Sequence, residues 1–186
     1  MTWKIDPTRS QIGFAIRKLK LFTVHGTFTR FSGAIDLNEN DPARSCVAVS
    51  VDPTSIATGI TKRDIHLRSA DFFDMARFPA LMFCSTRIEQ IDERHARVSG
   101  ALTIRDVTRE VVLEVSADEL TTDADGTTGV VFSATAIINR HDWEVSWGRL
   151  LVGDTVGVTI VLAAVRPAAA QVELRAVGSA PELSMR

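Results

Sequence analysis

Apolar residues recur at alternate positions in eight separate segments of this chain, with turn-forming residues between the segments. A period of two is typical of strands that bury one face and expose the other. The third segment, for example, places Val47, Val49 and Val51 on one face. The sequence therefore predicts eight strands, centred on residues 12–16, 31–37, 47–51, 81–84, 98–104, 111–117, 130–138 and 156–164.

Short polar turns such as 123–126 join successive segments, which favours antiparallel pairing over an alternation of strands and helices. We therefore expect an all-β protein whose eight strands close into an antiparallel barrel. Closure removes exposed edges and leaves an interior that is either filled by side chains or able to hold one small ligand. The alternation by itself does not distinguish a filled interior from one that holds a ligand.

The segment from Asp52 to Pro79 breaks this pattern between the third and fourth strands. Thr61 is placed to cap a helix, with Asp64 three residues on as a weak capping-box partner, and Asp71 begins a similar arrangement that Pro79 ends. The sequence predicts two short helices here. A connection of this length is often a lid or a binding loop.

One barrel and a tail fit the length of 186 residues, of which 45% are hydrophobic and 24% charged. We expect the barrel to occupy residues 1–166. The alternation is lost from Arg166 onward, so residues 167–186 are predicted to form a flexible tail or a short helix. A lid or a contact with another subunit is the alternative for this tail.

Charge and hydropathy argue against two kinds of partner. The 21 Lys and Arg against 23 Asp and Glu give a net charge of −2, so no nucleic-acid partner is expected. No apolar run approaches the ~20 residues that cross a bilayer, so no integral membrane segment is expected. The first residues lack a basic region followed by an apolar stretch, and a cytoplasmic location is expected. The sequence does not decide whether the protein forms a homodimer.

The motifs with the strongest catalytic or cofactor signals are missing. The four histidines are never two or four residues apart and the two cysteines form no CxxC, so neither a metal nor another cofactor is predicted. GxSxG, GxGxxG and GxxxxGK[ST] are also absent. Asp64 and Asp71 could act as an acid–base pair, yet both lie at predicted helix starts, where aspartate commonly caps. Cys46 and Cys84 lie in apolar runs and are expected to be reduced core residues.

Residues 63–74, which read RDIHLRSADFFD, resemble the hallmark loop of the YceI family of lipocalin-like, polyisoprenoid-binding proteins. The resemblance extends over residues 2–166, with two visible departures. Arg9 stands where the family commonly has histidine, and Trp143 with Glu144 stands where an aromatic–glycine pair is expected. The other matching motifs follow one another in the family's order at 3–7, 24–28, 31–33, 78–79, 100–104, 139–140 and 152–156.

The resemblance implies a lipocalin-like barrel that encloses a long apolar channel for a polyprenyl chain, with a polar head group near the opening. Strand alternation then assigns the side chains that point inward, because those on one strand share parity with its other large apolar residues. Plain core packing is the alternative role, most of all for the two phenylalanines. The predicted channel lining is Phe14, Val49, Leu102, Ile104, Leu113, Val115, Phe132, Val158 and Ile160.

Three arginines and one histidine are the predicted head-group ligands: Arg63, His66, Arg68 and Arg140. The first three belong to the hallmark loop, on a short helix that we expect to cover one barrel end. Arg140 shares parity with Ile138 and should point inward, where an unpaired charge is costly. Its partner is either an internal carboxylate, such as Asp64 or Asp71, or the phosphate or carboxylate of a ligand.

The sequence thus predicts a non-catalytic binding or carrier protein for a polyisoprenoid or a similar amphiphilic lipid. An enzyme that acts on such a lipid through His66, with Asp64 or Arg68, is one alternative. Prenyl-transfer chemistry lacks a DDxxD-like site in this sequence. An interaction domain with a filled barrel, whose tail contacts another protein, is the other alternative.

Overall fold

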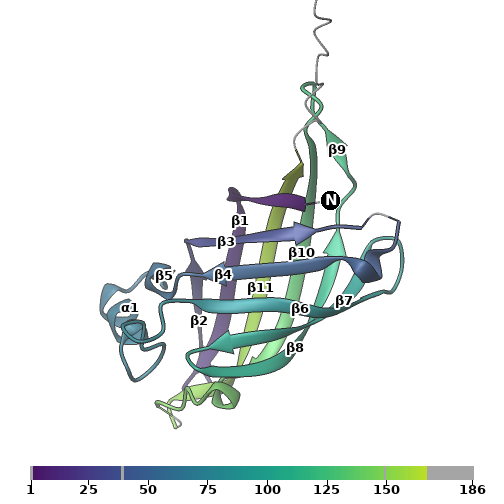
Figure 1. Cartoon of the computed structure of the whole chain (residues 1–186). Coiled ribbons are helices and arrows are strands. Elements are labelled where there is room, and N and C mark those ends of the chain that lie inside the picture. Colours follow the sequence, from purple (N-terminus) through teal and green to yellow (C-terminus); the bar gives the residue numbers. More distant parts are fainter. Residues whose placement is uncertain (1, 39, 149, 167–186) are drawn as a thin grey trace, which may run out of the picture.

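The computed structural model describes residues 2–38, 40–148 and 150–166, which form one antiparallel sheet with a short helix beside it (Figure 1). The tail predicted at 167–186 lies outside the described residues. The strands are β1 (Thr2–Lys18), β2 (Phe22–Phe28), β3 (Phe31–Asp36), β4 (Cys46–Val51), β5 (Ile56–Ala57), β6 (Leu81–Gln90), β7 (His95–Ile104), β8 (Val107–Ala117), β9 (Thr121–Thr122), β10 (Thr128–Asn139) and β11 (Val152–Arg166). The helix is α1 (Thr61–Arg68), and the 3₁₀ turns are η1 (Pro42–Arg44), η2 (Pro53–Ser55) and η3 (Arg140–Trp143).

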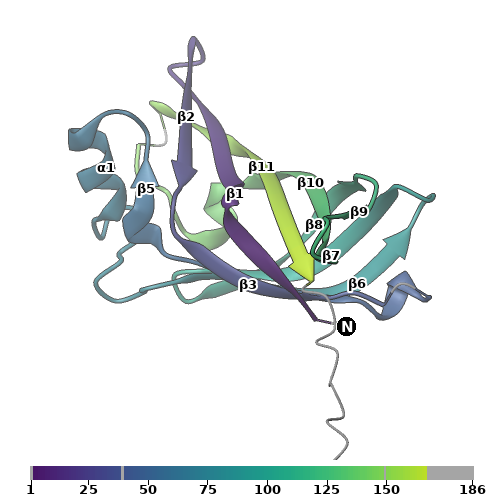
Figure 2. The ribbon, with the colours of Figure 1, turned by 90° about the horizontal axis from the view of Figure 1, so that it is seen from above.

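Eight strands close into a barrel in the order β1, β3, β4, β6, β7, β8, β10 and β11, with β11 pairing back onto β1. Every neighbouring pair is antiparallel, and the ring is visible from above in Figure 2. These are the eight strands that the alternation predicts, and α1 lies between the third and fourth of them. The predicted barrel with a helical insertion is therefore confirmed.

A bulge bends β1, which pairs with β11 along one edge and with β3 and then β2 along the other. The pairing with β11 passes from Asp6 to Gln11 with a shift in register, at a point where Pro7 has no N–H to donate. The Ser10 hydroxyl replaces the lost ladder contact, since it accepts from the Ala163 N–H at 2.9 Å and donates to the Asp6 carbonyl at 2.6 Å. Residues before the bulge pair with β3, and residues after it pair with β2.

Large apolar side chains close the barrel at the end where η3, β5 and α1 lie. Trp143 and Ile56 are almost completely buried there, and they pack in one cluster with Phe28 and Phe72. The indole Nε1 of Trp143 donates to the Leu102 carbonyl at 3.0 Å, which fixes η3 against β7. We call this end of the barrel the closed end.

Only one of the two helices predicted between Asp52 and Pro79 forms. The chain after α1 makes successive turns, in which the N–H of Asp74 donates to the Ser69 carbonyl at 2.8 Å. Asp74 has a φ of 47°, in the left-handed region, and a helix cannot continue through that conformation. The second helix was therefore a wrong prediction.

The predicted cap of α1 is also wrong. The residue at the N-cap is Ile60, which has no side-chain oxygen, and Thr61 is already helical. The Asp64 carboxylate instead accepts from the Thr58 N–H at 3.0 Å, so it ties the helix to the residues before it.

Within the described residues no helix has the length and apolar character needed to span a membrane.

The core placement predicted for the two cysteines is wrong. Cys46 and Cys84 are both free and exposed, on the outer faces of β4 and β6. The inward positions of these strands belong to Val47, Val49 and Phe83. Only one face of the apolar run at 81–84 therefore belongs to the barrel interior.

Candidate functional site

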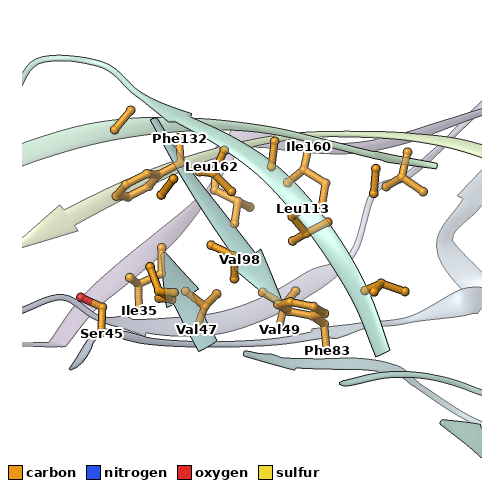
Figure 3. A pocket seen from close by; sticks show the side chains of 18 of the residues that line it. Ile35, Ser45, Val47, Val49, Phe83, Val98, Leu113, Phe132, Ile160 and Leu162 are labelled. Carbon is orange, nitrogen blue, oxygen red and sulfur yellow. The ribbon is translucent and has the colours of Figure 1, made fainter. Parts of the chain in front are cut away.

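A cavity of about 540 Å³ lies inside the barrel and is lined mostly by aliphatic and aromatic side chains. All eight barrel strands contribute to it, because alternate residues of each strand point inward (Figure 3). The volume falls within the ~300–1,000 Å³ typical of small-molecule sites. The barrel is therefore not filled by its own side chains.

The nine side chains predicted to line a channel all line this cavity. Figure 3 shows several of them, such as Val49, Leu113 and Ile160, pointing into the same space from opposite walls. Phe14 also packs on Phe28 of the closed end, with 5.7 Å between the ring centroids. The strand faces that the sequence predicts to point inward are thus the faces that point inward in the structure. Contact of these side chains with a ligand stays a prediction.

Polar residues line the cavity at only one end of the barrel in the described part of the chain. They come from the β3–β4 connection, the β6–β7 turn and the residues after β8, and most of them are exposed. We call this end the mouth. Its polar lining residues are Asn38, Ser45, Gln90, Asp92, Glu93, Arg94, His95 and Asp118.

Acidic side chains outnumber basic ones at the mouth. Arg94 forms an ion pair with Glu119, and the Nδ1 of His95 lies 2.9 Å from the Asp92 carboxylate. Backbone N–H donation from Arg94, followed by the hydrogen bond with the His95 ring, lowers the pKa of Asp92. Both basic groups thus face carboxylates, and Glu93 adds a further negative charge.

Sequence reasoning missed the mouth. Its residues lie on exposed turns, where no periodicity distinguishes a lining position from any other surface position. The only available signal was topological: in an antiparallel barrel the connections after β3, β6 and β8 must all lie at one end. The topology does not show which of the two barrel ends is open, because that depends on how the side chains pack at each end.

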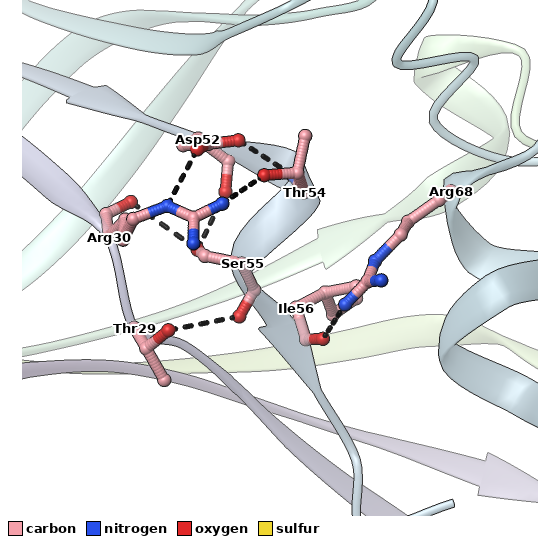
Figure 4. Close-up of polar contacts among 7 residues, drawn as sticks. All are labelled: Thr29, Arg30, Asp52, Thr54, Ser55, Ile56 and Arg68. Carbon is pink, nitrogen blue, oxygen red and sulfur yellow. Dashed lines mark hydrogen bonds and ion pairs between the residues drawn. The ribbon is translucent and has the colours of Figure 1, made fainter. Parts of the chain in front are cut away.

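The predicted head-group residues lie at the closed end, and none of the four lines the cavity. Arg63 donates from Nε to the Thr58 hydroxyl and from Nη2 to the Thr58 carbonyl, both at 2.7 Å. His66 Nε2 lies 2.9 Å from the Asp71 carboxylate. Arg68 Nη2 donates to the Ile56 carbonyl at 3.1 Å (Figure 4). The helix covers one barrel end as expected, but the end that it covers is not the opening.

Arg140 points inward, as its parity predicts, and it is buried with 5% of its surface exposed. Its guanidinium donates to four backbone carbonyls, two in the η3–β11 loop and two at the start of β11. The acceptors are Val145 at 2.7 Å, Trp147 at 2.8 Å, Gly153 at 2.9 Å and Val152 at 3.1 Å. Arg140 thereby fixes the path of this loop from its first residues to its last.

Comparison with known proteins agrees with the barrel fold. The family model of the YceI-like domain matches residues 3–164, and Protein YceI of Escherichia coli O6:H1 is 34% identical over 145 residues, 77% of this chain and 75% of that protein. The chain belongs to the YceI family. BcnA of Burkholderia cenocepacia superposes with a TM-score of 0.76 at 20% identity, covering 86% of this chain and 98% of that one. A polyisoprenoid binding domain from Saccharophagus degradans superposes with a TM-score of 0.68 at 18% identity, covering 89% and 98%.

Two of the motifs by which the sequence resembles the YceI family, at residues 139–140 and 152–156, meet at the closed end. Arg140 bonds to Val152 and Gly153, and His141 Nε2 lies 2.7 Å from the Asp154 carboxylate. Glu144, which replaces the expected glycine, has a φ of 59°. Glycine enters that left-handed region at little cost, which explains the family's preference and makes this chain's departure a strained one.

Proposed function

We propose that this YceI-family chain is a non-catalytic binding or carrier protein for a polyisoprenoid or a similar amphiphilic lipid. The observation that carries the proposal is the apolar cavity, to which all eight strands contribute. Each isoprene unit has five carbons, and its burial contributes roughly 4 kcal/mol gross at ~0.8 kcal/mol per carbon. The structural similarity to the Saccharophagus degradans polyisoprenoid binding domain supports the same ligand class.

The position of His66 supports binding over catalysis. His66 was the best candidate for an acid or base, and it lies at the closed end with Asp71 as its partner, outside the cavity lining. No group of three or more His, Cys, Asp or Glu among the described residues is placed to hold a metal ion. A filled interaction barrel would need an interior without free volume, and the cavity argues against it.

The polar end of the lipid lies at the mouth in this proposal, and the nine lining residues contact its chain. The excess of carboxylates there disfavours a phosphate head group, because like charges repel at close range. An uncharged head group, such as an alcohol, fits the mouth better. This placement replaces the one at Arg63, His66, Arg68 and Arg140.

The first test is mass spectrometry of an organic extract from the purified protein. A carrier with a dry apolar cavity retains host lipid, so we expect a prenyl chain or a comparable amphiphile in stoichiometric amount. Ala136→Phe fills the cavity from β10 and should reduce the bound lipid at least tenfold, whereas Thr135→Phe adds the same ring to the outer wall and should not.

Two results would count against the proposed function. Lipid-free protein that also binds no added polyprenyl alcohol would point to an interaction domain. Equal lipid content in the two phenylalanine variants would place the lipid outside the cavity. A cytoplasmic location and a transport role stay proposals, which fractionation of the source cells and lipid transfer between vesicles would test.

A further inference from the structure

Six large apolar side chains are exposed together beside the closed end, on the β1–β2 turn and on the loop between η3 and β11. The two segments are adjacent, since the N–H of Leu19 donates to the Leu151 carbonyl at 2.8 Å. Figure 2 shows the β1–β2 turn projecting beyond the barrel wall. We call this surface the apolar tip; it consists of Leu19, Leu21 (81% exposed), Phe22 (63%), Trp147 (41%), Leu150 (97%) and Leu151.

The backbone of the turn is unusual for the residues that it contains. Leu19 and Lys20 have φ values of 55° and 57°, in the left-handed region. Glycine and asparagine are the usual residues at such turn positions, because a larger side chain is strained there. Local stability therefore does not explain this leucine and lysine. Strained residues of this kind commonly belong to binding surfaces.

The second half of the apolar tip is held in place from inside the protein. Arg140 bonds to the carbonyls of Val145 and Trp147, so the loop has a fixed path. The Trp147 ring packs edge-to-face on His66, with 4.5 Å between centroids, and leaves part of its indole exposed. These contacts hold Trp147 in place within the apolar tip.

The β1–β2 turn of the apolar tip is basic, while the second loop is flanked by the exposed acidic residues Glu144 and Asp154. Residues 17–22 read RKLKLF, with three basic side chains and no acidic one, and residues 145–152 contain no acidic side chain either. Lys18, His25 and Arg63 also line a shallow hollow next to Phe22. Protruding leucine and aromatic residues surrounded by basic groups are the features by which proteins attach to the surface of an anionic bilayer.

We propose that the apolar tip docks on membranes that contain anionic phospholipids, with Leu21, Phe22 and Leu150 entering the headgroup region. The part-exposed indole of Trp147 is of the kind that favours a membrane interface. A second copy of the chain fits this surface less well, because a twofold contact would bring the basic residues of both turns together. The proposal does not depend on which lipid occupies the cavity.

Vesicle binding tests the proposal directly. The wild-type protein should sediment with vesicles of phosphatidylcholine and phosphatidylglycerol, bind pure phosphatidylcholine weakly, and dissociate at high salt. Its tryptophan emission should shift to the blue on binding. This shift in emission would come from Trp147, since Trp3 and Trp143 are already buried in the free protein.

Matched variants separate the tip from the rest of the surface. Leu21→Ser combined with Phe22→Ser should weaken partitioning more than tenfold, while Ile91→Ser, which removes an exposed apolar residue from the β6–β7 turn, should leave it unchanged. Lys20→Glu should weaken binding to the anionic vesicles at least fivefold, and Arg44→Glu near the mouth should change it by less than twofold.

Three results would overturn the docking proposal. The first is wild-type protein that does not bind anionic vesicles at low salt. The second is a tip double variant that is folded by circular dichroism and still binds like the wild type. The third is a dimer that the tip substitutions dissociate, without any vesicle binding, which would assign the surface to a second copy. None of these results changes the lipid content of the cavity, so the proposed carrier function is tested separately.

Discussion

The shape of the cavity depends on a contact between one aromatic ring and one glycine. Phe83 of β6 lines the cavity (Figure 3). Its ring lies over Gly100 on β7. A Cβ at position 100 would lie 2.4 Å from Cζ of Phe83 and 2.7 Å from the Cys84 carbonyl oxygen, closer than real contacts allow. A glycine inside a strand commonly marks a close approach of this kind. Gly100 therefore sets how far the Phe83 ring enters the cavity.

Gly100→Ala should push the Phe83 ring into the cavity and lower the free energy of unfolding by about 1–3 kcal/mol. Gly157→Ala on β11 is the matched control, because the nearest atom to its Cβ is 3.9 Å away, and it should be neutral or stabilising by about 0.4–1 kcal/mol. Urea denaturation measures both. Adding Phe83→Leu should recover part of the loss, and equal stability of the two alanine variants would show that the ring contact does not constrain the cavity.

The sequence was enough to predict which strand residues line the cavity. It was not enough to predict which turn residues form the mouth. Parity on a strand fixes which face a side chain occupies, and this was enough for residues such as Leu113 and Phe132. Asp92 and Glu93 lie on a turn, where parity carries no information. Arg140 was correctly predicted to point inward, yet two of its carbonyl acceptors lie on a loop whose path is not encoded in any local pattern.

At the level of elements, a polar network joins the insertion to the barrel at the closed end. Arg30, just after β2, forms an ion pair with Asp52 at 2.9 Å, and the N–H of Thr54 donates to the same carboxylate at 2.8 Å (Figure 4). The Ser55 hydroxyl donates to the Asp52 carbonyl at 2.7 Å, and its own carbonyl accepts from the Thr29 hydroxyl at 3.3 Å. This network holds η2 and β5 beside the β2–β3 corner and so positions the start of α1.

The Asp52 carboxylate should make part of the stability depend on pH. Hydrogen bonding by the Thr54 side chain, the largest cause, and by Arg30 lowers the pKa of Asp52. A lowered pKa in the folded state contributes stability above the unfolded value of about 3.9, and this contribution is lost as the pH falls through the folded value. Because the pair is largely exposed, Asp52→Asn should cost less than about 1 kcal/mol at pH 7.

The measurement is chemical denaturation of wild type and Asp52→Asn between pH 7 and pH 3. The difference in unfolding free energy should shrink below about pH 4, where the Asp52 carboxylate of the unfolded chain becomes protonated before that of the folded protein. A difference that stays constant over the whole range would mean that the asparagine acts through packing or turn geometry and not through the lost charge.

The elements that the sequence predicted are those long enough for a period to be visible. The three strands that it missed are β2, in which Gly26 interrupts the apolar series, and β5 and β9, which have two residues each. The second predicted helix failed for the opposite reason. Its capping residues were present, but short polar side chains at 69–74 serve turns as readily as helix starts.

The whole molecule has two chemically different ends. The mouth is open and predominantly acidic, whereas the closed end carries the apolar tip, the basic turn and the buried Arg140. In the proposed function a lipid chain fills the space between them and its head group stays at the mouth. Binding of matched ligands, a polyprenyl alcohol and the phosphate of the same chain length, can distinguish the two ends.

The alcohol should bind the wild-type protein more tightly than the phosphate, because the carboxylates of the mouth repel a dianion. Glu93→Lys reverses one of these charges and should improve phosphate binding about fivefold while leaving the alcohol unchanged. Glu110→Lys makes the same change on the outer wall of β8 and should affect neither ligand by more than twofold. Preference for the phosphate in the wild type would return the head group to a basic site.

Arg68→Ala and Arg140→Ala complete the comparison at the closed end. Arg68 bonds to the Ile56 carbonyl, and Arg140 bonds to four carbonyls of the η3–β11 loop and the start of β11. Both substitutions should therefore lower the melting temperature, Arg140→Ala by more, because it leaves buried acceptors without donors. Neither arginine lines the cavity, so any loss of lipid binding should be equal for alcohol and phosphate. A selective loss of phosphate binding in either variant, at unchanged melting temperature, would instead place the head group at the closed end, beside the arginines of the hallmark loop.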